Sequence, residues 1–468
     1  MTRTKALQLW STSLDFCCEA YSFAAMKKIL ILGAGRSSSS LIGYLLNKAA
    51  QKGWEITVGD YSETFAREKV GSSPRGNAIR FDINDEASSK QAIENTDVVI
   101  SLMPAHLHVL VAKICLELRK HLLNASYVTG EMKSFHEEAR AKGLLFLNEC
   151  GLDPGIDHMS AMQVIDRIKA DGGRLISFES FTGGLIAPET DPENPWRYKF
   201  TWNPRNVVMA GQGTAKFLQD GSFKYIPYQQ LFHRITHVTV PGFGEYEGYA
   251  NRDSLKYLET YGLQDIKTML RGTLRNKGYC GAWNVLVQLG CCDDSYSMES
   301  VDKLTHRDFL DSFLNNSSEE SLEKKISASF GLSASGEEMK RLHWSGLFSD
   351  ELVGLQYGTP AQILEHILMK KWKLNDGDKD FIVMWHRFVY DQSGSKKEIQ
   401  SYLTATGKDE KETAMAKTVG LPLAIAANLL IEGKISSRGV VIPTVKQIYE
   451  PILDELRKFD IKFTELDF

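Results

Sequence analysis

Acidic and imidazole side chains are concentrated in one short segment, Asn148–His158, which reads Asn-Glu-Cys-Gly-Leu-Asp-Pro-Gly-Ile-Asp-His. Carboxylates and imidazoles are the side chains that proteins most often use to move protons, so Glu149, Asp153 and His158 are candidate catalytic residues. A structural interpretation is also open. Asp-Pro-Gly is a turn sequence, and Asp157 could cap a helix that begins at His158.

A glycine-rich turn, Gly33-Ala-Gly-Arg-Ser-Ser38, follows an apolar run and precedes a helical pattern. Small residues there let the backbone approach a pyrophosphate, and the free amides of a helix N-terminus bind it. Asp60 stands 25 residues after Gly35, at the end of the next apolar run. A carboxylate there accepts hydrogen bonds from ribose hydroxyls and repels a 2′-phosphate, which favours NAD, with NADP as the alternative. Asp60 could also be an ordinary solvated residue at a strand end.

The pattern around this turn predicts which residues contact the dinucleotide. Asp82, which follows the third apolar run, could contact the adenine or simply belong to a turn. The expected cofactor residues from this part of the chain are Gly33, Gly35, Arg36, Ser37, Asp60 and Asp82.

Short apolar runs alternate with helical segments from Lys27 to about residue 150. Such alternation requires a parallel sheet that is covered by helices on both faces, with its ligand at the carboxyl ends of the strands. We therefore predict a doubly wound α/β domain of Rossmann type over residues 26–150. The expected strands are Lys28–Leu32, Glu55–Asp60, Asn77–Phe81, Asp97–Leu102, one that ends near Tyr127-Val128, and Leu144–Leu147.

The regular alternation of apolar runs and helical segments ends after Gly155. A long helix is expected over His158–Ala170, and a hairpin is expected from Phe381–Trp385 and Glu398–Leu403. The apolar stretch Ala414–Leu430 is expected to be a helix interrupted at Gly420-Leu-Pro422. We predict an α+β substrate-binding and dimerisation domain over 151–414, with a small helical subdomain at about 270–372. Residues 415–468 are expected to return towards the first domain.

Composition excludes several classes of protein. Lysine and arginine total 55 against 59 acidic residues, so the net charge of −4 argues against nucleic-acid binding through a basic face. The apolar stretch Leu421–Ile431 is far shorter than the ~20 residues of a membrane span. Seven cysteines without a Cys-x-x-Cys pair indicate neither a disulfide framework nor a zinc site. A cytoplasmic protein without a metal is expected. The first apolar run breaks at Ser11-Thr-Ser13, which argues against a secretory signal. Met26 stands directly before a predicted strand, so residues 1–25 are interpreted as an N-terminal extension, compatible with disorder.

Several longer blocks carry a family resemblance. They are Ser126-Tyr-Val, Asn148-Glu149 with Gly151–His158, Gly183-Gly-Leu185 with Ala187-Pro-Glu189, Tyr198–Trp202, Asn251-Arg-Asp-Ser254, Arg271-Gly-Thr-Leu-Arg275 and Ala414–Pro422. Their order and content resemble the L-glutamate-forming saccharopine dehydrogenase family, also called saccharopine reductase. The resemblance covers about 27–468.

The resemblance implies an oxidoreductase of lysine metabolism that acts on a CH–NH group. Saccharopine would be oxidised with NAD(P) to L-glutamate and 2-aminoadipate 6-semialdehyde, or formed by the reverse reaction, in a protein that is a homodimer. It implies that the nicotinamide half of the cofactor contacts Ser101, Leu102, Ser126, Tyr127 and Val128. The implied substrate contacts are Ser101, Leu102, Cys150, Gly151, Leu152, Asn251, Arg252 and Asp253, although Cys150 could equally be a small buried hydrophobic residue.

One position departs from the family pattern. Relatives read Ser-Leu-(Ile/Leu)-Pro-Tyr-x-x-His, whereas here Ala105 replaces the tyrosine and His108 matches the histidine. The chain either uses His106 in its place or works without that group. Two alternatives therefore stay open: a related imine-reducing enzyme such as carboxynorspermidine dehydrogenase, and a dinucleotide-binding protein without catalysis.

Overall fold

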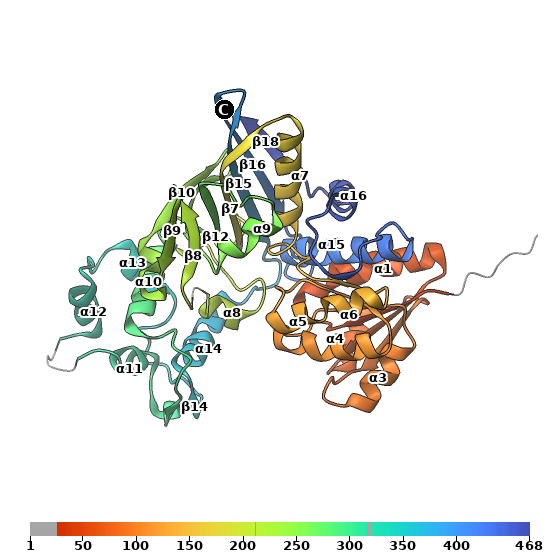
Figure 1. Ribbon diagram of the computed structural model, residues 1–468. Helices are drawn as coiled ribbons and strands as arrows, with labels where there is room; N and C mark the ends of the chain where they lie inside the picture. The colour runs from red at the N-terminus through yellow and green to blue at the C-terminus, as the bar shows by residue number, and fades with distance from the viewer. Residues whose placement is uncertain (1–25, 211, 316–319) are drawn as a thin grey trace, which may run out of the picture.

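The first of two large sheets is parallel and carries the glycine-rich turn (Figure 1). The computed structural model describes residues 26–210, 212–315 and 320–468, so the extension expected over 1–25 lies outside the described residues. The strand order within the described chain is β17-β6-β5-β4-β1-β2-β3. These strands are β1 Lys28–Leu32, β2 Glu55–Asp60, β3 Gly76–Arg80, β4 Val98–Ser101, β5 His121–Asn124, β6 Leu145–Leu147 and β17 Gly439–Val441.

Helices cover both faces of this sheet, as the doubly wound prediction required. One face packs on α1 and α15 through residues such as Ile29 and Ile31, and the other packs on α3 and α4 through Leu30 and Leu32. The helices are α1 Ser39–Lys52, α2 Glu63–Val70, α3 Glu86–Glu94, α4 His108–Glu117, α5 Gly130–Ser134, α6 His136–Ala141 and α15 Ala414–Ile431.

The second sheet is mixed and has the order β10-β11-β12-β7-β15-β16-β18, with β8 also paired to β12 and β9 paired to β8. The predicted hairpin is confirmed, because β15 and β16 pair antiparallel, with Phe381 opposite Thr406 at one end and Gln392 opposite Ser395 beside the turn. The strands are β7 Arg174–Ile186, β8 Ala215–Gln219, β9 Ser222–Ile226, β10 Ile235–Val240, β11 Gly244–Ala250, β12 Thr268–Asn276, β15 Asp380–Gln392, β16 Ser395–Thr406 and β18 Thr464–Asp467.

Helices also flank the second sheet. Two of them, α7 Ile156–Ala170 and α16 Lys446–Arg457, pack together beside it. The domain also contains a group of shorter elements, two before β12 and the others after it. β12 itself occupies the start of the range that was expected to be helical. These elements are α8 Pro204–Val208, α9 Tyr257–Thr260, α10 Tyr279–Leu289, β13 Met298–Glu299, α11 His306–Asp311, α12 Leu322–Phe330, α13 Glu337–Trp344, β14 Tyr357–Gly358 and α14 Pro360–Trp372.

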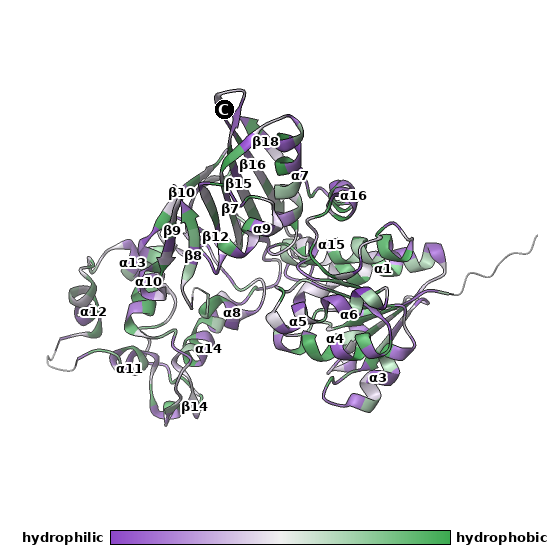
Figure 2. Cartoon of the chain, in the orientation of Figure 1, coloured by the Kyte–Doolittle hydropathy of each residue, from purple (hydrophilic) through white to green (hydrophobic). Residues whose placement is uncertain are grey.

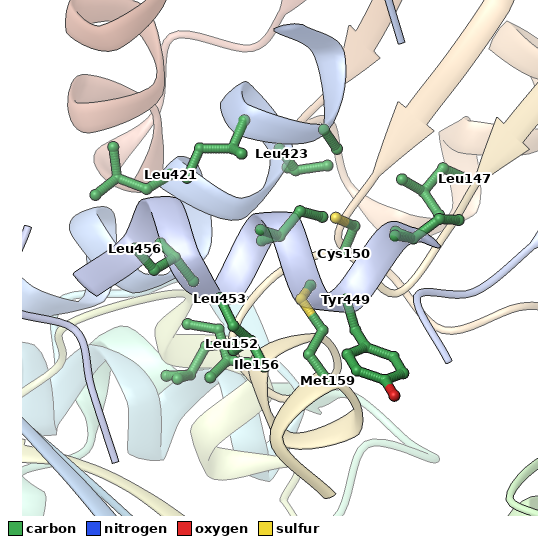
Figure 3. Close-up of a cluster of buried hydrophobic side chains, with 14 of the residues drawn as sticks. Leu147, Cys150, Leu152, Ile156, Met159, Leu421, Leu423, Tyr449, Leu453 and Leu456 are labelled. Carbon is green, nitrogen blue, oxygen red and sulfur yellow. The ribbon is translucent and has the colours of Figure 1, made fainter. Parts of the chain in front are cut away.

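The C-terminal segment belongs to both sheets. β17 joins the parallel sheet beside β6, and β18 pairs with β16 in the mixed sheet. Before these two strands in the chain, α15 contacts α1 of the first domain and β15 of the mixed sheet. Figure 3 shows the resulting core, in which Leu423 of α15 lies near Cys150 and Tyr449 of α16 lies near Met159. Residues distant in sequence thus hold the Asn148–His158 segment between the sheets.

The structure corrects two expectations about helices. α15 is continuous through Pro422, because packing of its buried residues outweighs the low helix propensity of glycine and proline. At 18 residues it is long and apolar enough to cross a membrane, but 83% of it is buried inside the protein, as expected for a core helix (Figure 2). α7 begins at Ile156 rather than His158, so Asp157 is not its N-cap. Asp157 accepts instead from the Gly155 amide, at 2.6 Å.

Gly420 is required where α15 meets the first turn of α1. A Cβ at this position would lie 2.9 Å from the Leu41 amide nitrogen and 3.2 Å from the Ser37 carbonyl oxygen. We expect Gly420→Ala to lower the free energy of unfolding by about 1–3 kcal/mol, because backbone must move to make room. Gly43→Ala, on the open side of α1, is the matched control and should stabilise by about 0.5–1 kcal/mol. Urea denaturation measures both, and equal effects would contradict the close approach.

Candidate active site

The glycine-rich turn has the geometry that a pyrophosphate requires. Gly33 has a φ of +105°, its amide donates to the Gly59 carbonyl at 2.8 Å, and a Cβ there would lie 3.0 Å from the Leu102 carbonyl oxygen. A Cβ at Gly35 would face open space. The short 3-10 turn Arg36–Ser38 and α1 begin without a side-chain cap, so backbone amides are free to bind an anion.

Asp60 lies where the sequence placed it, at the end of β2, and it also supports the turn. Its Oδ2 accepts from the Ala34 amide at 2.7 Å, and its Oδ1 accepts from the Ser62 amide at 2.9 Å. An ionised carboxylate has about four acceptor positions, so capacity for ribose hydroxyls remains. Two other predicted cofactor residues have local partners: Arg36 donates to the Phe200 carbonyl at 3.1 Å, and Asp82 accepts from the Asn84 amide in a turn.

A serine–histidine–serine bridge joins the ends of β4 and β5. Ser101 Oγ lies 2.9 Å from His108 Nδ1, and Ser126 Oγ lies 2.8 Å from His108 Nε2. His108 is buried, and this burial lowers the pKa of its imidazole to about 4, so the ring is neutral at pH 7. The structure therefore brings together Ser101 and Ser126, which the sequence assigned to the cofactor site, through a residue that it did not assign.

Glu149 and His158 form a buried pair. His158 Nε2 lies 2.9 Å from Glu149 Oε2, and its Nδ1 lies 2.5 Å from the Tyr261 hydroxyl. Glu149 also accepts from the Tyr257 hydroxyl at 3.0 Å and from the Val128 amide at 2.9 Å. Burial raises the pKa of Glu149, but the His158 and Val128 hydrogen bonds outweigh it and bring the pKa below its usual value. This pair positions the 126–128 segment from inside the protein.

Arg271 is shared by two carboxylates of different exposure. Its Nη2 lies 2.9 Å from Asp153 Oδ1 and also pairs with Asp157 Oδ2. The side chains of Asp153 and Asp157 are 16% and 1% exposed. The Tyr127 hydroxyl donates to Asp153 at 2.9 Å, and the Asp153–Pro154 peptide is cis. The partly exposed carboxylate is thus the one that a substrate could reach.

The pKa values of Asp153 and Asp157 are shifted in opposite directions. Burial and the neighbouring Asp157 raise the pKa of Asp153, and Arg271 only partly offsets them. Burial also acts on Asp157, but His158 and Arg271 lower the pKa of Asp157 below its usual value. Pairs of titratable groups whose pKa values are pushed apart are typical of acid–base sites. Asp153 is therefore suited to exchange a proton, while Asp157 stays ionised and holds Arg271.

Two polar loops approach this site from the mixed sheet. The Arg252 guanidinium lies 4.7 Å from the centre of the Tyr127 ring, and Arg252 is exposed with a φ of +49°. Asn251 donates from its side chain to Thr273 Oγ1 at 3.1 Å. Asp253 accepts from the Leu255 amide at 3.1 Å and caps the turn that follows.

Arg275 is a buried cation without a carboxylate partner among the described residues. Its guanidinium lies 5.0 Å from the ring of Tyr198, 5.2 Å from that of Tyr279 and 6.0 Å from that of Tyr249. Its Nε and the Tyr198 hydroxyl have no hydrogen-bond partner in the part of the chain that the structure describes. Its Nη1 donates to the Leu274 carbonyl at 3.0 Å. A buried guanidinium without a carboxylate partner is costly, so this cation could pair with an anionic ligand.

Two residues expected to contact substrate lie in the core instead. Cys150 is fully buried, and Leu152 is 5% exposed (Figure 3). Burial raises the pKa of the Cys150 thiol, which is therefore protonated and unreactive. Gly151 lies beside Ala125, where a Cβ would come within 2.9 Å. These residues shape the segment below the site, and the alternative reading of Cys150 as a small hydrophobic residue agrees with the structure.

Comparison with known proteins explains this arrangement. Residues 29–147 match the saccharopine dehydrogenase NADP binding domain, and residues 151–461 match the saccharopine dehydrogenase C-terminal domain. The chain belongs to the saccharopine dehydrogenase family. Apo saccharopine dehydrogenase (L-Glu forming) from Saccharomyces cerevisiae has a similar structure, with a TM-score of 0.84 and 30% identity over 94% of this chain and 100% of that chain.

Relatives in this family differ in length. Saccharopine dehydrogenase [NADP(+), L-glutamate-forming] from Schizosaccharomyces pombe is 32% identical over 94% of this chain and 99% of its own length. Alpha-aminoadipic semialdehyde synthase, mitochondrial, from Bos taurus is 35% identical over 95% of this chain. The chain spans about half the length of that relative, at 48%.

The family pattern also bears on the missing tyrosine. Ala105 and His106 lie in an exposed turn between β4 and α4. Tyr127, by contrast, contacts Asp153 directly.

The sequence did not single out Tyr257 or Tyr261 as site residues, and it gave Arg271 only as one end of a motif. The signal that could have found Arg271 and Arg275 is their placement with Thr273 at alternate positions of one strand, which puts all three on one face.

Arg271 should be essential for stability as well as for the site. We expect Arg271→Met to lower the free energy of unfolding by about 3–5 kcal/mol, because two buried carboxylates lose their counter-ion. The matched control is Arg387→Met. Arg387 also bridges two acids, Glu179 at 3.0 Å and Glu398 at 2.8 Å, but is 36% exposed. That variant should cost no more than about 1 kcal/mol. Equal losses in urea denaturation would contradict the buried network.

Proposed function

We propose that the chain catalyses NAD(P)-dependent oxidation of saccharopine to L-glutamate and 2-aminoadipate 6-semialdehyde, or the reverse condensation, in lysine metabolism. The observation that carries this proposal is the Asp153–Arg271–Asp157 group at the carboxyl ends of the parallel strands, in a chain that matches both family domains. The names of the fungal relatives, which state an L-glutamate-forming saccharopine dehydrogenase, support the substrate.

The dinucleotide would be held by the turn at Gly33–Ser37, by Asp60 and by the 126–128 segment. When bound, it accepts a hydride from the carbon next to the secondary amine. We propose a preference for NAD. The Asp60 carboxylate supports this, since it disfavours a 2′-phosphate. The matched family domain and the S. pombe relative are named for NADP, so the choice depends on whether Asp60 outweighs the remaining contacts.

The substrate would lie along the polar face of β12, on which Thr273 is half-buried and Arg271 and Arg275 are buried. Every second residue from Arg271 to Arg275 lies on this face, with Thr273 between the two arginines. Arg271 and Arg275 are therefore about 13 Å apart along the strand. Thr182 of β7 lies beside Thr273, and its buried hydroxyl has no hydrogen-bond partner within residues 26–210, 212–315 and 320–468. Saccharopine carries carboxylates at both ends, and we assign Arg275 and Arg252 to bind them because guanidinium pairs well with carboxylate.

Asp153 would move the protons. Oxidation of a secondary amine requires removal of the amine proton, then activation of the water that attacks the imine, then protonation of the departing amine. Asp153 is partly exposed and held by Tyr127, and its raised pKa brings it closer to the working pH. Glu149 and His158, the other predicted catalytic residues, are enclosed by tyrosines and would act by fixing the Val128 amide.

The reaction itself is tested by assaying the purified chain with saccharopine and NAD. As an ionised base in the oxidation, Asp153 should give kcat/KM an acidic limb that lies above the ordinary pKa of an aspartate. Asp153→Asn should remove that limb and lower kcat about 10²–10⁴-fold, the usual contribution of acid–base catalysis. Asp454→Asn, at a 58% exposed side chain of α16, should change neither. Absence of turnover with either dinucleotide would contradict the proposed function.

Asp60 should decide the dinucleotide preference. Asp60→Ser removes the carboxylate and should weaken NAD while relatively favouring NADP, by about tenfold in the ratio of their dissociation constants. Asp85→Ser is the matched control, because Asp85 caps α3 at a different site. Equal preference before and after the Asp60 substitution would contradict the assignment, and a wild-type preference for NADP would contradict NAD as the cofactor.

The two proposed carboxylate ligands should affect substrate more than cofactor. We expect Arg252→Ala and Arg275→Met each to raise the KM for saccharopine at least about tenfold, the value of one charge-assisted hydrogen bond, with less than twofold change for NAD. Arg205→Met removes a surface ion pair with Asp294 and Glu365 and is the control. A parallel rise in both KM values would remove these arginines from the substrate site.

We also propose a cytoplasmic homodimer, which rests on the family resemblance and the balanced charge. Light scattering and cell fractionation test these assignments. A monomer, or a mitochondrial location such as the bovine relative's name states, would contradict them.

A further inference from the structure

We propose that His108 is a positioning residue, which directs the hydroxyl proton of Ser126 towards an acceptor oxygen of the bound dinucleotide. This inference rests on the proposed function, because it takes the 126–128 segment as part of the cofactor site. His108 begins α4, and its ring lies between the end of β4 and the segment after β5.

Both ring nitrogens of His108 are occupied by serine hydroxyls. Nδ1 lies 2.9 Å from Ser101 Oγ and Nε2 lies 2.8 Å from Ser126 Oγ. Ser101 and His108 are 0% and 4% exposed, whereas Ser126 is only half-buried. The Ser126 amide donates to Asn124 Oδ1 at 2.9 Å, so backbone and side chain are both held. The bridge thus connects an inner hydroxyl with one at the edge of the site.

The direction of the hydrogen bonds follows from burial. A neutral imidazole has one N–H donor and one acceptor nitrogen, so one serine must donate to the ring and the other must accept from it. The contact with His108 is the one hydrogen bond of the Ser101 hydroxyl in the described part of the chain, and a buried hydroxyl proton needs an acceptor. Ser101 therefore donates to Nδ1, and the Nε2–H donates to Ser126.

This polarity leaves the Ser126 proton unused inside the protein. Ser126 accepts from His108, so its own O–H points to a group outside the bridge. Reversing the bridge would strand the Ser101 proton in the core and turn Ser126 into a donor to the ring. An acceptor oxygen such as that of the nicotinamide carboxamide matches the outward donor. His108 acts through Ser126 and touches no ligand itself.

Fluorescence titration of NADH measures this effect without turnover. Ser126→Ala and His108→Met should each raise the NADH dissociation constant about five- to tenfold, as for loss of one neutral hydrogen bond. The double variant should be no weaker than the weaker single variant, because both changes remove the same donor. His108→Gln keeps one acceptor and one donor between the serines, and should stay within about twofold of wild type.

His121→Met is the matched control. His121 is a largely buried imidazole at the opposite end of β5, where it accepts from the Leu145 amide at 2.9 Å. Its loss should lower the melting temperature and leave the NADH dissociation constant unchanged. If His108→Met is too unstable to purify, Ser126→Ala against His108→Gln decides, and weakening of the alanine variant alone is expected.

Three results would overturn the inference: wild-type affinity in His108→Met, losses that multiply in the double variant, or no NADH binding by the wild-type protein. Failure of the proposed function has a different signature. In that case wild-type protein binds NADH and shows the coupling between His108 and Ser126, but does not turn over saccharopine.

Discussion

One guanidinium, that of Arg271, holds the site together. It lies between Asp153 and Asp157 in a buried environment, where an unpaired charge of either sign is strongly unfavourable. Arg271 comes from β12, Asp153 from the segment before α7 and Asp157 from the first turn of α7. This single side chain therefore connects the mixed sheet to the end of the parallel domain. The unequal exposure of the two acids then separates their roles, one as a counter-ion and one as a proton carrier.

The rest of the architecture holds the acidic segment against that arginine. α15 packs between α1 and the mixed sheet, and the last strands of the chain join one sheet each. Gly420 lets α15 approach the cofactor turn, so the same helix supports both halves of the site. Two buried imidazoles hold the 126–128 segment in place. His108 contacts the Ser126 hydroxyl, and His158 contacts Glu149, which accepts from the Val128 amide.

Local patterns were sufficient to predict the parallel domain. The predicted strands have three to six residues in the structure and alternate with helical patterns, and these signals depend only on neighbours in sequence. β17 was missed because its three residues become a strand only by pairing with β6, far earlier in the chain. The expected break at Pro422 was wrong because burial of a whole helix outweighs one unfavourable residue.

The site shows the same division. The glycine-rich turn and Asp60 could be predicted because they depend on residues that are close in sequence. The structure places the turn after β1 and Asp60 at the end of β2. The partners of the acidic segment were not readable, since Arg271 and Tyr257 lie more than 100 residues away. The exposure of a side chain could not be predicted from the sequence either. Cys150 was therefore left between a substrate contact and a small buried hydrophobic residue, and the structure places it in the core.

The central claim is that Arg271 leaves Asp157 ionised while Asp153 retains a raised pKa. Carbon-13 NMR of the aspartate carboxyls, assigned with Asp153→Asn and Asp157→Asn, measures both titrations in the folded protein. The account predicts that Asp153 titrates above the ordinary aspartate range and Asp157 below it. Titration of Asp153 at or below its ordinary value, or the reverse order of the two groups, would contradict the account.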